Sequence, residues 1–319
     1  MEAFGHLFDH GGELDHSALL PAIERAVSAV EPLLKQVGGY PDSYRKPVTA
    51  ALEYAHYLAA NVPGPVTVDR GTYASDAFVH ALFPDIDAVA EAIHSSQALQ
   101  DYQRKFPGSD ELYALMGMRR IEKKMVGVAL SGQTVQRDVV QKVVYFTSHT
   151  IDNPAPSEQQ ARERIAVNFF DSLVGKVKKR VEQRKQDKQS KLLEKDMLMA
   201  RLRMANGRDN PVLEEQLAGM INTLQATVSS LELGNYAADF EAVLLHAEEH
   251  LSLKQTPIVL DRMGIRHTTD NEDRGKMIMF NDLVGYDRRD WTVTMVRCSN
   301  LQNESFAEKL DKAYRKLVM

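Results

Sequence analysis

The sequence predicts an α+β protein that is predominantly helical, with a helical N-terminal body, a small mostly antiparallel sheet of about five strands and a long inserted helical hairpin or coiled coil. Three observations favour this class. Apolar residues recur at helical spacing through residues 1–120. Segments on both sides of 157–232 instead carry apolar residues at period two, as in strands. Between them, residues 157–206 form one helical run of about fifty residues.

The first 120 residues are expected to form a helical N-terminal domain. Residues 17–37 carry an apolar stripe ended by Gly38 and Gly39, and Pro32 is expected to kink the last turn. A second helix is predicted over 41–61 and is followed by a loop rich in Pro and Gly. Further helices are expected at about 75–82, 84–105 and 109–121.

The sheet is predicted from strand patterns that begin after residue 120. Residues 123–148 read as a β-hairpin, and three further strands are expected at 257–265, 276–283 and 291–298. A two-stranded hairpin is marginal alone in water, so it should pair with the three later strands. The sequence therefore predicts an α+β domain over 121–319 that carries residues 157–232 as an inserted helical hairpin.

The long helix has clear start and stop signals. Ser157 and Gln160 form a capping box, and Gly207 and Pro211 separate the long helix from its return arm. At 1.5 Å per residue the long helix spans roughly 75 Å, so part of it must project or lie across another body. The return arm carries a coiled-coil stripe that consists of Leu213, Leu217, Met220, Leu224, Val228 and Leu231. Further helices are expected at 236–253 and 303–317.

Composition bounds the class of protein. The chain has 319 residues, a net charge of −5 and one cysteine, Cys298, which excludes an intrachain disulfide and a Cys-rich metal site. The first hundred residues carry 13 acidic and only 5 basic side chains, a net charge of −8, whereas the remainder is slightly basic with a net charge of +3. The sequence shows no secretory signal and no apolar run of membrane-spanning length, so we expect a cytoplasmic protein without a membrane partner.

A row of basic residues is the main candidate for partner binding. Lys176, Arg180, Arg184 and Lys188 follow one another at every fourth position, where like charges repel by about 0.2–0.5 kcal/mol per pair. An anionic surface along this basic row would relieve the repulsion. Nucleic-acid phosphates and the acidic N-terminal body are both possible, and a solvated helix face is the simpler alternative. Arg184 and Lys188 also interrupt the apolar stripe, which is expected to resume at Leu192.

Histidine patterns give weak candidates for a metal site. His246, Glu249 and His250 match the H-x-x-E-H pattern of inverted zinc proteases, in which two histidines on one helix face bind zinc. No third ligand is evident, so a pair of histidines beside the apolar stripe is the favoured interpretation. His6, His10 and His16 crowd the N-terminus, but Gly11 and Gly12 would interrupt any helix presenting them together. We expect no metal and no cofactor.

The turn before Trp291 is a second candidate for partner binding. Arg288 and Arg289 lie in this expected hairpin turn, where they suit contact with a carboxylate or a phosphate. A charged turn beside a buried Trp is the simpler alternative. Cys298 ends a strand and has no assignable base, so we do not expect it to act as a nucleophile.

These patterns favour a non-enzymatic intracellular interaction or scaffold protein that acts through a projecting coiled-coil hairpin. Its partner would be another protein or a homo-oligomer. One alternative is a nucleic-acid-associated protein that uses the basic helix 176–195. Another is an enzyme whose site is assembled from distant residues, because no catalytic motif is recognisable and catalytic residues cannot be assigned.

Overall fold

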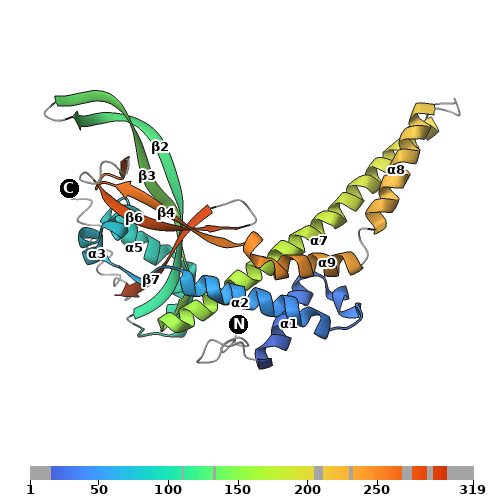
Figure 1. The fold of residues 1–319 in the computed structure, drawn as a ribbon, viewed down its shortest axis with the longest axis horizontal. Coiled ribbons are helices and arrows are strands. Elements are labelled where there is room, and N and C mark those ends of the chain that lie inside the picture. The colour runs from blue at the N-terminus through green and yellow to red at the C-terminus, as the bar shows by residue number, and fades with distance from the viewer. Residues whose placement is uncertain are drawn as a thin grey trace. The chain divides into compact units, whose positions relative to one another are not determined.

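A computed structural model describes residues 16–109, 111–131, 134–204, 211–229, 233–267, 275–285 and 290–299. The chain forms two compact units that interleave along the sequence (Figure 1). Residues 1–59 and 166–251 form a helical unit, and residues 60–165 and 252–319 form a unit built on a sheet. Residue 120, the boundary expected from the sequence, lies within the 60–165 segment of the sheet unit.

The helical unit begins with α1 (His16–Val30) and α2 (Arg45–Asn61), joined through 3₁₀ helices at Pro32–Gln36 and Asp42–Tyr44. The helix expected over 17–37 is therefore split. Pro32 starts the 3₁₀ helix, and the Glu31 carboxylate caps it by accepting the Leu33 N–H at 3.4 Å. The unit continues through α7 (Glu158–Met204) from residue 166 onward, α8 (Pro211–Ser229), α9 (Leu233–Leu245) and a 3₁₀ helix at Ala247–Glu249.

The apolar face of α7 contributes to the core of the helical unit. Phe170, Val174, Val177 and Val181 are buried at helical spacing, as the sequence predicts. Their burial is accompanied by an ion pair between Arg25 of α1 and Asp171 of α7. The 47-residue helix begins after Ser157, whose hydroxyl accepts the Gln160 N–H at 3.3 Å. The predicted start of the long helix is therefore confirmed.

The sheet has seven strands of mixed direction, so the predicted small sheet of about five strands is wrong. The strands are hydrogen-bonded in the order β1-β7-β2-β3-β5-β4-β6. Strand β6 also pairs with β7, so the strands from β7 to β6 form a closed ring and β1 lies outside it. Two of the strands have only three residues each, and β1 pairs parallel to β7. The strands are β1 (Val66–Val68), β2 (Glu111–Ser131), β3 (Thr134–Ala155), β4 (Ser252–Leu260), β5 (Ile265–His267), β6 (Lys276–Val284) and β7 (Asp290–Ser299).

The helix expected at 109–121 is instead the first half of β2. Leu112, Ala114, Met116 and Met118 are buried at period two and face the core of the sheet unit. Leu, Met and Ala favour helices in isolation, but burial between β3 and β7 overrides that weak preference.

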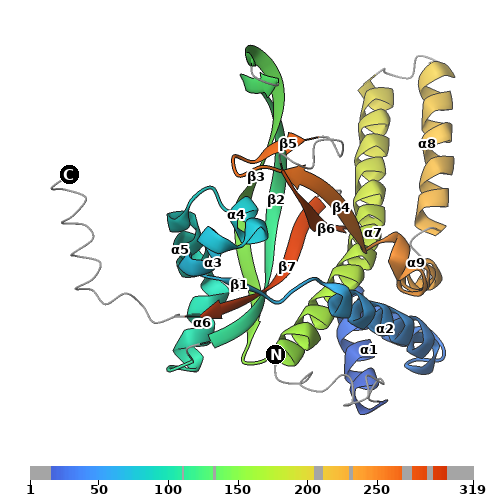
Figure 2. The same cartoon turned by 60° about the vertical axis from the view of Figure 1, so that its left-hand side comes forward.

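Four short helices pack on the sheet of this unit (Figure 2): α3 (Arg70–Ser75), α4 (Ala77–Leu82), α5 (Ile86–Ser95) and α6 (Gln97–Lys105). The single helix expected over 84–105 is divided at Ser96. The Ser96 hydroxyl accepts the Leu99 N–H at 3.2 Å and donates to the Ile151 carbonyl of β3 at 2.8 Å. One buried side chain thus caps α6 and ties it to the sheet.

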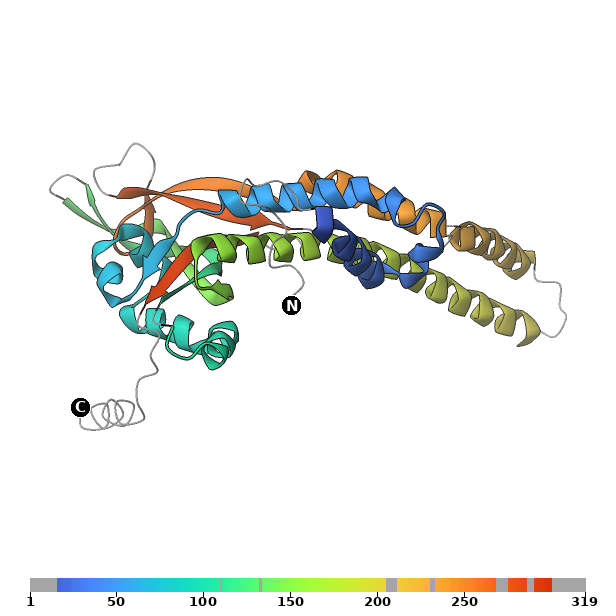
Figure 3. The same cartoon turned by 90° about the horizontal axis from the view of Figure 1, so that it is seen from below.

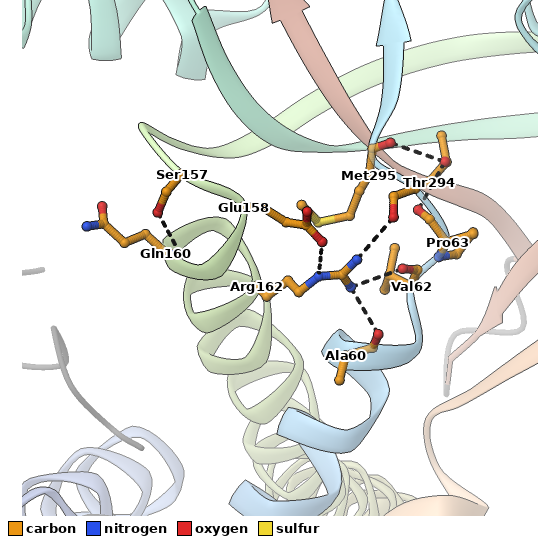
Figure 4. Close-up of polar contacts among 10 residues, drawn as sticks. Ala60, Val62, Pro63, Ser157, Glu158, Gln160, Arg162, Thr294 and Met295 are labelled. Atoms are coloured by element: carbon orange, nitrogen blue, oxygen red, sulfur yellow. Dashed lines mark hydrogen bonds and ion pairs between the residues drawn. The ribbon is translucent and has the colours of Figure 1, made fainter. Parts of the chain in front are cut away.

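The guanidinium group of Arg162 binds the loop before β1 (Figure 4). Arg162, in the first turns of α7, donates to the carbonyls of Ala60, Val62 and Gly64 at 3.0–3.3 Å and pairs with Glu158 at 2.8 Å. Gly64 has φ +107°, and a Cβ there would lie 2.4 Å from the Met295 carbonyl. Only glycine therefore fits where this loop passes β7.

Strand β3 is bent by three bulges. Each register shift in its pairing with β2 coincides with a non-glycine residue at positive φ: Asp138 (61°), Ser148 (55°) and Asn153 (58°). Such bulges increase twist and discourage edge-to-edge aggregation. This protection matters here because Val126 and Val140, paired directly opposite each other, are each 66% exposed.

A buried carboxylate joins four strands where the sheet closes. Asp282 of β6 accepts hydrogen bonds from Arg120 of β2 (2.9 Å), Thr256 of β4 (2.7 Å) and Thr292 of β7 (2.7 Å).

Asp282→Ala should lower the free energy of unfolding by roughly 3 kcal/mol, because it leaves Arg120 and two hydroxyls without an acceptor. Urea denaturation followed by circular dichroism measures the effect. Asp101→Ala removes an exposed ion pair with Arg104 and should change the same free energy by less than about 1 kcal/mol. Equal losses in the two variants would contradict this role for Asp282.

His149 should make the sheet unit sensitive to acid. Its Nε2–H donates to the Leu82 carbonyl at 2.8 Å, and its ring stacks on Phe83 at 4.8 Å. Burial lowers the pKa of His149, more than the Leu82 hydrogen bond raises it. As the pH falls through about 6.5, His149 of the unfolded chain therefore binds a proton, whereas His149 of the folded chain stays neutral until a lower pH. Stability is complete above that pH and should fall below it, by at most about 1.4 kcal/mol per pH unit. His149→Gln keeps a donor but does not titrate, so its denaturation midpoint should change less between pH 7 and 5. Identical pH profiles for the variant and the wild type would contradict the assignment.

Candidate interaction site on helix α7

The basic row lies on the side of α7 that faces its own unit. Lys176, Arg180, Arg184 and Lys188 are all half-buried. Burial lowers the pKa of Lys176, and the neighbouring Arg180 acts in the same direction. These cations are therefore not a fully solvated stripe.

Arg184 has a partner within the helical unit. Its Nε and Nη2 donate to the two carboxylate oxygens of Asp239 in α9, at 2.7 and 3.2 Å. The Asp239 side chain is only 13% exposed, and its hydrogen bonds raise the pKa of Arg184. This two-pronged contact joins α7 to α9 at the position that follows Val181 in the buried stripe of α7.

Lys185 makes a second link from α7. It bonds to Glu31, the cap of the first 3₁₀ helix, and its ammonium lies 5.9 Å from the centre of the Tyr236 ring. The hydrogen bond lowers the pKa of Glu31 and raises that of Lys185. Glu31 belongs to the acidic first hundred residues, so at this point the basic helix does meet an internal anion.

Beyond Val181, the half-buried side of α7 becomes cationic. The half-buried positions recur at intervals of four and three residues, the spacing of a helix that packs against a neighbouring helix. Helix α8 runs antiparallel beside this part of α7 (Figures 2 and 3), and Leu217 and Met220 of α8 are half-buried. The apolar stripe does not resume at Leu192, which is exposed, but at Leu198. We call this set the inner stripe: Arg184, Lys188, Lys191, Lys195 and Leu198.

The opposite side of the same segment is apolar and exposed. Leu193 is 63% exposed, Met197 51% and Met204 81%, and Ala200 between them is also exposed. At 3.6 residues per turn, this outer stripe of Leu193, Met197, Ala200 and Met204 lies about 180° from the inner stripe. A helix packed on a protein body normally has the reverse arrangement, with its apolar side inward. Sequence reasoning followed the stripe from Phe170 and overlooked the outer stripe, although its spacing is visible in the sequence.

The histidine pattern does not lie on a helix. Helix α9 ends at Leu245, and His246 and His250 flank the 3₁₀ helix 247–249, so the expected helical face is absent. Burial lowers the pKa of His250, and the nearby cations Arg180 and Lys176 lower it further. The same cations would oppose a metal ion. No group of three or more metal-ligating side chains occurs among the residues that the structure describes.

The remaining site residues expected from the sequence are either buried or outside the described residues. Arg288, Arg289, His6 and His10 lie outside the described residues, as does the helix expected at 303–317. Cys298 is buried, which raises the pKa of its thiol to about 12 and keeps the sulfur protonated at neutral pH. Within the described ranges, no helix is both long and apolar enough to cross a membrane.

Comparison with known proteins gives no relative. No protein-family model, no curated protein and no solved structure matches this chain.

The contacts of Arg184 distinguish it from Lys188, its neighbour in the basic row. Arg184→Glu would place a carboxylate against the largely buried Asp239 and should lower the free energy of unfolding by about 2 kcal/mol. Lys188→Glu should change that free energy by no more than about 0.5 kcal/mol. Thermal unfolding of both variants checks this difference. A loss for Lys188→Glu as large as that for Arg184→Glu would contradict it.

Proposed function

We propose that this chain is a non-enzymatic interaction or scaffold protein that binds a protein through the α7–α8 hairpin. The exposed outer stripe on α7 carries the proposal. Exposed apolar patches on proteins mark contact sites, and this one lies on a regular helix at the spacing that a second helix would match. We place the protein in the cytoplasm as part of the same proposal, because its only cysteine is a buried thiol.

The cationic inner stripe supports the same function. Lysine at helix-packing positions weakens the contact between two helices while its methylene stem still covers apolar surface. The hairpin thus has a weak internal seam and a strongly apolar outer side.

The nucleic-acid alternative has less support. In the segment 176–195, Arg184 and Lys185 bond to Asp239 and Glu31 of the same unit. These two cations are therefore already neutralised, which reduces the charge available to phosphates.

Methionine oxidation followed by mass spectrometry tests the proposal in cells. Met197 and Met204 of the outer stripe should oxidise several-fold more slowly in cells than in dilute purified protein, because a partner covers them. Met263, which is 79% exposed in the sheet unit, should react alike in both samples. Equal reactivity of Met197 and Met204 in the two samples would count against a covered stripe.

Two adjacent leucines provide matched variants for this experiment. Leu193→Glu places a charge in the outer stripe and should return Met197 and Met204 to the reactivity seen in dilute protein. Leu192→Glu makes the same chemical change about 100° away around the helix and should leave the protection in place.

A further inference from the structure

The outer stripe is symmetric about the midpoint between Leu198 and Met199. Leu193 and Met204 are equally distant from that point, and so are Met197 and Ala200. An antiparallel second copy of α7 would therefore place its Met204 level with Leu193 and its small Ala200 level with Met197. A large side chain opposite a small one allows close packing in both halves of such a contact.

The charged residues beside the stripe are also placed evenly about this midpoint, with acids on one side of it and arginines on the other. Glu194 and Arg201 lie on one flank of the stripe, and Asp196 and Arg203 lie on the other. All four side chains are exposed. On each flank, the acid lies before the midpoint and the arginine after it.

These flanks favour one orientation of a second copy. In an antiparallel two-fold pair, each flank faces the same flank of the other copy. Glu194 then approaches Arg201, and Asp196 approaches Arg203, in both halves of the contact. A parallel pair brings opposite flanks together, so that Glu194 would approach Asp196 and Arg201 would approach Arg203. Like charges across such a contact disfavour the parallel orientation.

We infer that the outer stripe is a self-association surface, on which a second copy of this chain packs antiparallel to α7. The inference rests on the proposed function and names its partner. Self-complementary surfaces related by a two-fold axis are the commonest way in which proteins form dimers. Because only four apolar positions contribute from each copy, the dimer should be weak and should depend on protein concentration.

Charge exchange tests the pairing in the full-length chain. The variant E194R/D196R makes both flanks basic, and R201E/R203E makes both acidic. In sedimentation velocity the wild type should form a dimer as its concentration rises, each variant alone should remain a monomer, and an equimolar mixture should recover the dimer. Because all four positions are exposed, circular dichroism should show unchanged folding. A monomeric wild type, or variants that dimerise as the wild type does, would overturn the inference.

Cysteine crosslinking tests the orientation. Under mild oxidation Ala200→Cys should crosslink to itself, because it lies close to the two-fold axis. Leu193→Cys should not, since the two copies of residue 193 would lie roughly 16 Å apart along the helix. A mixture of Leu193→Cys with Met204→Cys should crosslink. Efficient crosslinking of Leu193→Cys alone would indicate a parallel pair and would overturn the antiparallel arrangement.

The two proposals can fail separately. If the purified chain stays monomeric while Met197 and Met204 are protected in cells, the inference of a second copy is wrong and the proposed function stands with another protein as partner. If the chain is monomeric and both methionines react freely in cells, both proposals are wrong.

Discussion

The bond between Arg184 and Asp239 lies where the helical unit stops burying the apolar side of α7. Up to Val181 the helix packs through valine and phenylalanine side chains that are almost fully buried. At the next position of the stripe, a guanidinium group is bound by a carboxylate from α9. Beyond it, the inner side is lined by lysines and the apolar side chains lie opposite. Beyond Arg184, apolar side chains thus lie on the exposed side of α7 and cations on its inner side. The proposed interaction surface, the outer stripe, is a consequence of this reversal.

The sheet unit has a corresponding constraint in Asp282. Strands from both halves of the chain meet at its carboxylate, and the hydroxyls of Thr256 and Thr292 with the guanidinium of Arg120 satisfy it. A buried carboxylate is tolerated only with such donors, so the contact selects one pairing of β2, β4, β6 and β7. In both units, therefore, a largely buried carboxylate binds an arginine from another element.

Local signals predicted the helices better than the sheet. The helix start at Ser157 and the apolar stripe from Phe170 to Val181 depend only on nearby residues, and the structure contains both. The first half of strand β2 is predicted as a helix over 109–121, because its Leu and Met residues favour helices until β3 and β7 bury them. Strands β1 and β5 are too short to show any periodicity. The partner of Arg184 could not be predicted either, because Asp239 is 55 positions away in the sequence and only the packing of α9 brings it near.

Hydrogen exchange along α7, measured by mass spectrometry at two protein concentrations, tests this account most directly. Amides between residues 166 and 181 should exchange slowly and equally at both concentrations, because the helical unit buries that face. Amides between 186 and 204 should exchange faster in dilute protein and become protected as the concentration rises and the outer stripe is covered. Distal amides that exchange at the same rate at both concentrations, or as slowly as the proximal ones in dilute protein, would contradict the account.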